Sequence, residues 1–334
     1  MKVLFTGMAS SHCKRPANVT FFTALSDAIS TFAEVTWASP SQSWTKKDLD
    51  KYDAIIFGFI PPTSLSANKL FGALHTLGLM FDSPKLRLVV DSAQVWQYKN
   101  SVQAVKRDFS SLFGHFYSRR EGYQLAKDSP KTIKAAIDHM SNSEWPPIFY
   151  PSLPWVSNTH VSNLLGFVGE DRLVPVNLDS LLITNQPARI GRSDYWAIDA
   201  PKSTWLKGLE KLLTYPRTPT RIGRKTDDTY ALGIISNSVG LILPPQERKT
   251  GTWWNYRMIQ ALNTNTPITT YWQDTYKFHP SWGALAYQIE DMSVGERQKL
   301  ASNQKESYVK SIPTKDAIIQ QLKLNLIDSA KERI

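Results

Sequence analysis

The stretch that decides the fold is VGLILPPQERKTGTWWNYRMIQALNTNTPITTYW, residues 239–272. It opens with a short apolar run, residues 239–243, stopped by two prolines, which is typical of a buried parallel strand. After a polar, basic loop, the amphipathic pattern of residues 253–262 predicts a helix. A breaker cluster follows, and β-branched residues at 268–270 predict another strand. The order strand, loop, helix, strand is one unit of a parallel α/β sheet.

The start of this helix is suited to an anion. In such a unit the helix N-terminus lies beyond the carboxyl end of the strand, with free N–H groups and the positive end of its dipole facing the crevice. Gly251 and Thr252 lead into it, and Arg248, Lys249 and Arg257 add full charges. The place is therefore suited to a diphosphate, and the absence of a GxGxxG or Walker sequence argues against the usual dinucleotide and nucleoside triphosphate cradles. The alternative is a helix packed on a sheet, with solvated cations at its start.

The segment also carries a family resemblance. Its form, Gly-x-Trp-Trp-x-x-Arg-x-x-x-Ala-Leu leading to Pro-Ile-Thr-Thr, resembles the donor-site helix of GT-B glycosyltransferases, and most of all that of bacteriophage DNA base glucosyltransferases. The resemblance implies that Arg257 meets the diphosphate of a nucleotide sugar, with Gly251, Thr252 and Trp253 beside it. The phage enzymes have Arg-x-x-Glu here, whereas this chain has Gln260 in place of the acid, which weakens a hydrogen bond to a ribose hydroxyl.

Composition sets outer limits on the class of protein. The chain has 334 residues, 42% hydrophobic and 11% aromatic, which is enough for two globular domains. A net charge of +10 favours a polyanionic partner or an anionic donor. One cysteine excludes an internal disulfide, no Cys/His pattern predicts zinc, and no apolar run reaches the ~20 residues of a membrane span. We expect a cytoplasmic protein, in the host cytoplasm if a phage encodes it, without membrane association and monomeric.

The first half reads as a doubly wound parallel sheet. Strands are predicted at four places separated by helices: residues 2–8, 35–38, 53–60 and 86–90. Helices are predicted from residue 18 or 20 to about 32, over 45–52 and over 66–80.

Asp91 is the predicted catalytic base. It stands where the strand LRLVV ends, and such folds keep their sites beyond the carboxyl ends of strands. A carboxylate there can take the proton of an acceptor hydroxyl during a single inverting displacement. The phage enzymes place their catalytic Asp in Leu-Phe-x-Asp after the corresponding strand, which Leu88 to Asp91 match loosely. The alternative is that Asp91 caps a helix that starts near Gln94.

The first loop is assigned to the same site. It contributes Gly7, Ser10, Ser11 and His12. His12 is the competing base, although a lone loop histidine more commonly contacts the donor or solvent.

Between residues 96 and 134 aromatic residues alternate with cations. Eight Lys and Arg residues face three carboxylates in this segment. We assign DNA binding to five of these cations: Lys99, Lys106, Arg107, Arg119 and Arg120. Cations neutralise phosphates, and aromatic rings can stack beside a base flipped out of the duplex. The alternative is an amphipathic helix pair with Phe inside and Lys outside.

The middle of the chain is harder to interpret. WPPIFYPSLPW, residues 145–155, is too rich in proline for a central strand and predicts a rigid crossing or an edge strand. Residues 178–183 are expected to form the last strand before the link. We therefore expect an acceptor-binding Rossmann-like domain over 1–188, a nucleotide-sugar-binding one over 189–310, and a helix over 311–334 that returns to the first. The resemblance implies that the two domains face each other across a cleft.

Three further residues are predicted to bind the donor. Lys202 and Ser203 open the helix expected at 203–213, where the phage enzymes have two arginines. Asp274 follows the last strand of the quoted stretch, where GT-B enzymes hold sugar hydroxyls, although it can equally cap a helix.

Together these residues predict an inverting glycosyltransferase. The donor is a nucleotide sugar, most simply a UDP-sugar, and the acceptor is a hydroxymethylated pyrimidine in phage DNA. Nothing in the sequence requires a cofactor or a divalent metal, because cations and a helix dipole can steady the leaving diphosphate, and a metal remains compatible with the site. One alternative keeps the fold and takes a glycan or a lipid-linked acceptor. Another is a nucleic-acid-binding protein without catalysis.

Overall fold

The computed structural model describes about half of the chain in detail. The described residues are 1–7, 21–38, 42, 44–59, 75–90, 143–152, 169–184, 195–199, 220–222, 228–243, 256–270 and 286–331. The chain forms two compact units. The first comprises Met1–Leu181 and Lys315–Ile334, and the second Leu182–Thr314.

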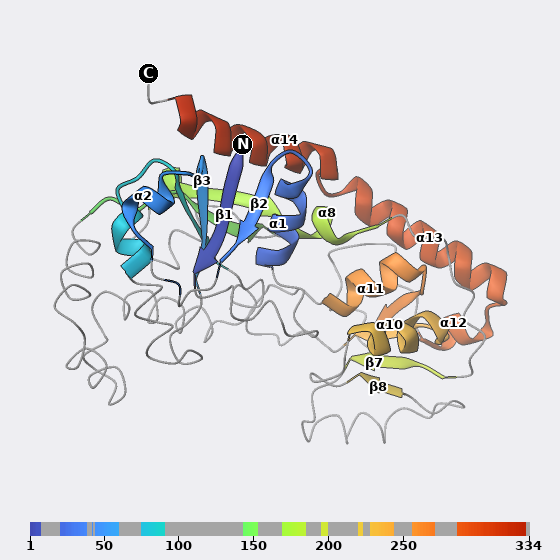
Figure 1. Ribbon diagram of the computed structural model, residues 1–334. Helices are drawn as coiled ribbons and strands as arrows, with labels where there is room; N and C mark the ends of the chain where they lie inside the picture. Colours follow the sequence, from blue (N-terminus) through green and yellow to red (C-terminus); the bar gives the residue numbers. More distant parts are fainter. Residues whose placement is uncertain are drawn as a thin grey trace. The chain divides into compact units, whose positions relative to one another are not determined.

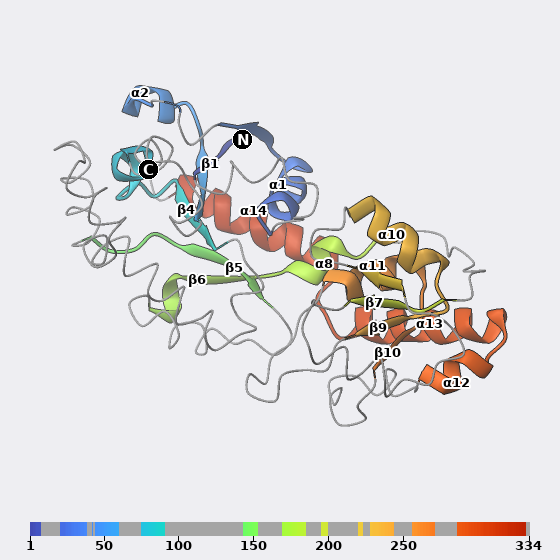
Figure 2. The same ribbon diagram turned by 90° about the horizontal axis from the view of Figure 1, so that it is seen from below.

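The first unit is built on a parallel sheet of six strands (Figures 1 and 2). The strands are β1 (Lys2–Gly7), β2 (Glu34–Trp37), β3 (Ala54–Phe59), β4 (Leu86–Val90), β5 (Ile148–Ser152) and β6 (Leu173–Asn177). They lie in the order β2-β1-β3-β4-β5-β6. The chain steps outward from β1 to β2 and then crosses to β3 on the other side, so the topological switch point lies between β1 and β3.

Helices α1 (Phe21–Ser30) and α14 (Lys315–Lys331) cover one face of this sheet (Figure 1). A right-handed crossover from β1 to β2 places α1 on that face, and α14 packs against α1. Two polar side chains fasten α14 to the strands. Arg87 of β4 donates to the carbonyl of Asn325 at 2.9 Å, and Gln321 donates to the carbonyl of Pro175 in β6 at 2.8 Å.

The core of the first unit is aromatic beneath α1. Phe5 and Phe22 are fully buried, with ring centroids 5.1 Å apart, and Trp37 meets Phe22 edge-on at 5.3 Å. Burying one such side chain stabilises a fold by about 1.5–3 kcal/mol. The short helix α2 (Lys46–Leu49) begins at a capping box, in which Thr45 and Asp48 each satisfy the other's backbone N–H.

The second unit contains a parallel sheet of four strands. Read from β8, its strands follow the order second, first, third, fourth, as the first four strands of the other sheet do. These are β7 (Ala197–Asp199), β8 (Thr220–Ile222), β9 (Leu241–Leu243) and β10 (Ile268–Thr270), in the order β10-β9-β7-β8. Helices α10 (Asp228–Asn237) and α11 (Tyr256–Thr264) join β8 to β9 and β9 to β10. Both steps run in one direction, so right-handed crossovers place both helices on one face, where they pack against each other.

Two C-terminal helices complete the second unit. They are α12 (Ala286–Asp291) and α13 (Val294–Lys310), which packs against α11. Ser293 and Glu296 form a capping box that fixes the start of α13, and the same hydrogen bonds to Ser293 lower the pKa of Glu296. Pro313 lies between α13 and α14.

Polar contacts connect the first residues of the second unit, which begins at Leu182, to α11 and α13. Asn263 at the end of α11 accepts from the backbone N–H of Thr184 at 2.8 Å and donates to the carbonyl of Leu182 at 3.0 Å. Lys305 of α13 donates to the carbonyl of Thr184 at 2.7 Å, and its burial lowers its pKa.

The α/β class and the parallel sheets are confirmed, and two local expectations are wrong. Residues 148–152 form β5 between β4 and β6, not an edge strand. Proline is tolerated because the pairing with β4 involves only Ile148 and Phe149, so Pro151 lies beyond it and pairs with β6 alone.

The last strand before the link is β6, and the expected strand at 178–183 is instead the helix α8 (Leu178–Leu182). Asn177 turns the chain, because its side-chain oxygen accepts from the backbone N–H of Ser180 at 2.9 Å and from its hydroxyl at 2.8 Å. An asparagine at this place caps a helix.

The helices of the described part of the chain include none with the length and apolar character of a bilayer span.

Candidate functional site

The helix that follows β9 carries the predicted anion-binding residues. Arg257 is the second residue of α11, and Gln260 lies one turn later on the same side. Since α11 follows β9, its first turn belongs to the carboxyl edge of the four-stranded sheet, beside the β7/β9 switch point.

Arg257 and Gln260 are hydrogen-bonded to each other inside the protein. Nη1 of Arg257 donates to Oε1 of Gln260 at 2.7 Å, and the two residues are only 8% and 4% exposed. An arginine guanidinium carries a positive charge and five N–H donors. The pair therefore offers a fixed cation where the sequence predicts a diphosphate.

The far end of α11 is held by three buried polar side chains. The hydroxyl of Thr264 donates to the carbonyl of Gln260 at 2.9 Å and lies 2.9 Å from that of Thr266, which donates to the carbonyl of Ile235 at 3.2 Å. Gln304 of α13 then clasps Ile268 of β10, accepting from its N–H and donating to its C=O, both at 2.8 Å. These contacts hold the end of α11 and the start of β10, at the edge of the sheet opposite the predicted donor site.

In the first unit, the carboxyl edge at the switch point brings two glycines together. Gly7 ends β1 with φ +101° and pairs with Gly58 of β3. A Cβ atom on Gly7 would lie 2.7 Å from the Gly58 carbonyl oxygen, so only glycine fits. Nearby, β3 and β4 end in register at Phe59 and Val90, and Asp91 is the next residue along the chain.

Tyr150 is a buried titratable residue that the sequence did not single out. It lies on β5, beside β4, and is fully buried. Burial raises the pKa of Tyr150 to about 12, so its phenol stays protonated at neutral pH and cannot act as a general base there. The only sequence signal was an aromatic residue in a run interpreted as a crossing.

Most of the predicted site residues lie outside the described part of the chain. These are Asp91, Ser10, Ser11 and His12 of the first half, Lys202, Ser203, Gly251, Thr252, Trp253 and Asp274 of the second, and the DNA-binding cations Lys99, Lys106, Arg107, Arg119 and Arg120. Their roles remain predictions. Of the predicted set, the structure describes Gly7, Arg257 and Gln260, and brings the last two into direct contact.

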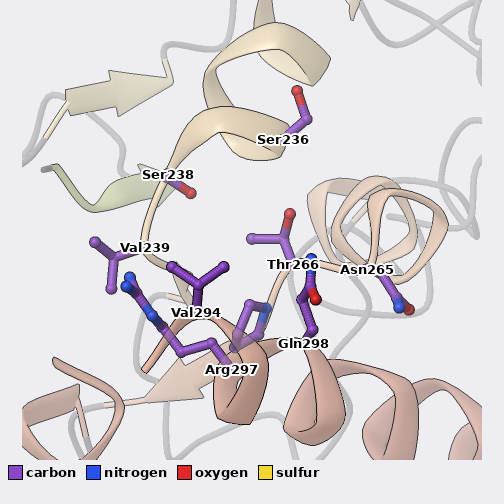
Figure 3. A pocket seen from close by; sticks show the side chains of 9 residues that line it. Ser236, Ser238, Val239, Asn265, Thr266, Val294, Arg297 and Gln298 are labelled. Atoms are coloured by element: carbon purple, nitrogen blue, oxygen red, sulfur yellow. The ribbon is translucent and has the colours of Figure 1, made fainter. Parts of the chain in front are cut away.

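Figure 3 shows a small pocket that lies away from this edge, where α10 leads into β9 and the chain enters β10. Ser236 and Ser238 line it, and both hydroxyls donate to carbonyls of the same chain, at 3.2 and 2.8 Å. It lies at the amino ends of the strands, opposite the predicted donor site. In the ranges that the structure describes, no group of three or more His, Cys, Asp or Glu residues could hold a metal ion.

No protein-family model matches the chain, and neither does any curated protein. Among solved structures, the DNA-modifying enzyme β-glucosyltransferase, studied with and without uridine diphosphoglucose, aligns with 98% of this chain and 100% of its own. The TM-score is 0.55 and the sequence identity 10%. The chain has the fold of that glucosyltransferase. This is the GT-B fold that the resemblance implied, now supported over the whole chain.

Two further solved structures are similar at lower scores. An α-glucosyltransferase in complex with UDP and a 13-mer DNA containing a HMU base has a TM-score of 0.49 at 11% identity, covering 99% of both chains. The T4 phage enzyme BGT, in complex with its UDP-glucose substrate, has a TM-score of 0.47 at 12% identity, and the alignment covers 99% of this chain and 97% of its own. At these identities the likeness is one of fold.

Proposed function

We propose that this chain is an inverting glycosyltransferase that moves a sugar from a nucleotide sugar, with UDP-glucose the first donor to test, to a hydroxymethylated pyrimidine in DNA. The observation that carries the proposal is the full-length likeness to a DNA-modifying enzyme whose substrate is uridine diphosphoglucose. The net charge of +10 and the cation-rich segment 96–134 support a polyanionic acceptor.

The donor end of the reaction is assigned to α11. The diphosphate of the donor carries two negative charges and gains a third on the oxygen that loses the sugar, and Arg257 with the helix dipole would stabilise this charge as the bond breaks. The buried contact with Gln260 supports this role, because a preorganised cation needs no reorganisation during the reaction.

The acceptor end is assigned to Asp91. Its carboxylate would take the proton from the hydroxymethyl group as the oxygen attacks the anomeric carbon, while the bond to the diphosphate breaks on the opposite face. One bond forms, one breaks, and the configuration inverts.

The test is mass spectrometry of DNA containing hydroxymethylcytosine or hydroxymethyluracil after incubation with the protein and UDP-glucose. A gain of one hexose per modified base is expected, and none on unmodified DNA. The Asp91→Asn variant should lose transfer by several orders of magnitude while retaining UDP binding. Transfer to a free glycan but not to DNA would contradict the assigned acceptor, and an absence of binding to any sugar nucleotide would contradict the enzyme.

A further inference from the structure

Gln260 stands where the related motif has an acid, and its side chain faces Arg257. The amide oxygen accepts a short bond, 2.7 Å, from Nη1 of the guanidinium. Charge-assisted bonds of this length are about twice as strong as bonds between neutral groups. This bond occupies one of the two lone pairs of the amide oxygen and directs it toward Arg257.

The surroundings of Gln260 keep its side chain in that orientation. Gln260 is 4% exposed, and its backbone carbonyl accepts a hydrogen bond from the hydroxyl of Thr264. Thr264 is in turn paired with Thr266 at 2.9 Å. The backbone beneath the amide is therefore fixed from both the helix and the turn that follows it.

We infer that Gln260 is a positioning residue for Arg257, not a contact to the ribose of the donor. A guanidinium carries five N–H donors in one plane, so donating one of them to a fixed amide oxygen restricts the orientation of the whole plane. Gln260 thereby aims Arg257 at the diphosphate, and it does so without adding a negative charge beside a dianionic ligand. This inference rests on the proposed function, because it names the part of the nucleotide sugar that the pair recognises.

The inference is tested with three ligands that separate the parts of the donor: UDP, inorganic diphosphate and uridine. The variant is Gln260→Met, which keeps the length of the side chain and removes the oxygen. Titration calorimetry should show UDP and inorganic diphosphate both weakened by about tenfold, with uridine unchanged. If UDP and uridine weaken while inorganic diphosphate does not, Gln260 contacts the nucleoside and the inference fails.

A double-variant cycle gives a second, independent outcome. If Gln260 acts through Arg257, then Arg257→Ala combined with Gln260→Met binds UDP no more weakly than Arg257→Ala alone. Additive losses would overturn the inference. Gln298→Met, a matched change at the pocket of Figure 3, should leave all three affinities unchanged. Where Gln260→Met unfolds, Gln260→Glu takes its place, because it retains an oxygen for Arg257 and adds one negative charge: it should weaken the binding of inorganic diphosphate and leave that of uridine unchanged.

Failure of the proposed function has a different signature. If the wild-type protein binds neither UDP nor any other sugar nucleotide, the enzyme assignment is lost. If the wild-type protein binds UDP but Gln260→Met leaves inorganic diphosphate binding intact, only the role of Gln260 is lost.

Discussion

Gln304 of α13 offers the sharpest test of how the second sheet is held. Its side chain is fully buried and makes both hydrogen bonds to Ile268, at 2.8 Å each, as a neighbouring strand would. Gln304→Met keeps the volume but leaves the N–H and C=O of Ile268, itself fully buried, without these partners. Each unsatisfied buried group costs about 1–3 kcal/mol, so we expect a loss of about 2–6 kcal/mol in the stability of the second unit.

Hydrogen exchange is the assay of choice, because a chain of two units need not unfold in one step. The Ile268 amide should exchange faster in Gln304→Met by the factor that corresponds to that loss, whereas amides of β1 in the other unit should not change. Gln298→Met, on the same helix and half-buried, should change stability by less than about 0.5 kcal/mol. An Ile268 amide that exchanges at the wild-type rate would refute the reasoning.

Three further predictions concern the glycines, Arg87 and Tyr150. Gly7→Ala places Cβ 2.7 Å from the Gly58 oxygen at φ +101°, and should lower the unfolding free energy by more than about 1 kcal/mol in urea titrations. Gly233→Ala, with open space around it in α10, should raise the unfolding free energy by about 0.5–1 kcal/mol, so a change of the same sign for both variants would contradict the geometry. Arg87→Met removes hydrogen bonds to three backbone carbonyls, those of Pro84, Leu86 and Asn325. It should lower the stability of the first unit by about 3 kcal/mol and speed amide hydrogen exchange in α14. Unchanged exchange in α14 would show that Arg87 does not anchor the helix. Tyr150 has a folded-state pKa of about 12 against a usual value of 10.0, so the stability linked to its proton is complete below pH 10 and is lost as the pH rises toward 12; Tyr150→Phe should flatten this decline, and identical pH profiles would contradict the burial effect.

Much of the fold could be predicted because local patterns and topology agree. The apolar run predicted as a strand, the amphipathic pattern predicted as a helix and the β-branched residues predicted as the next strand match β9, α11 and β10 within a few residues. The misassignments arose where one residue was given too much weight. Pro151 argues against a central strand only if its N–H is needed for pairing, and that depends on where the neighbouring strand ends.

The site was predictable only where it is local. Arg257 and Gln260 are three residues apart in a helix, so their contact follows from helical spacing, although their burial does not. Gln304 reaches Ile268 across 36 residues of sequence, and no local pattern in either segment indicates that contact. The assignment of Asp91 rests on the rule that sites lie beyond strand ends, and it stays a prediction, because its partners depend on loops that the pattern of strands does not define.

The last helix, α14, has a consequence for biosynthesis. It belongs to the unit that begins at Met1, yet the whole of the second unit, Leu182–Thr314, is translated in between. During synthesis, the second unit can therefore fold before α14 has left the ribosome to pack on the N-terminal sheet. Until they arrive, the surface beside α1 that α14 later covers is available to chaperones, and a premature stop after Thr314 would release a nascent chain that lacks its closing segment.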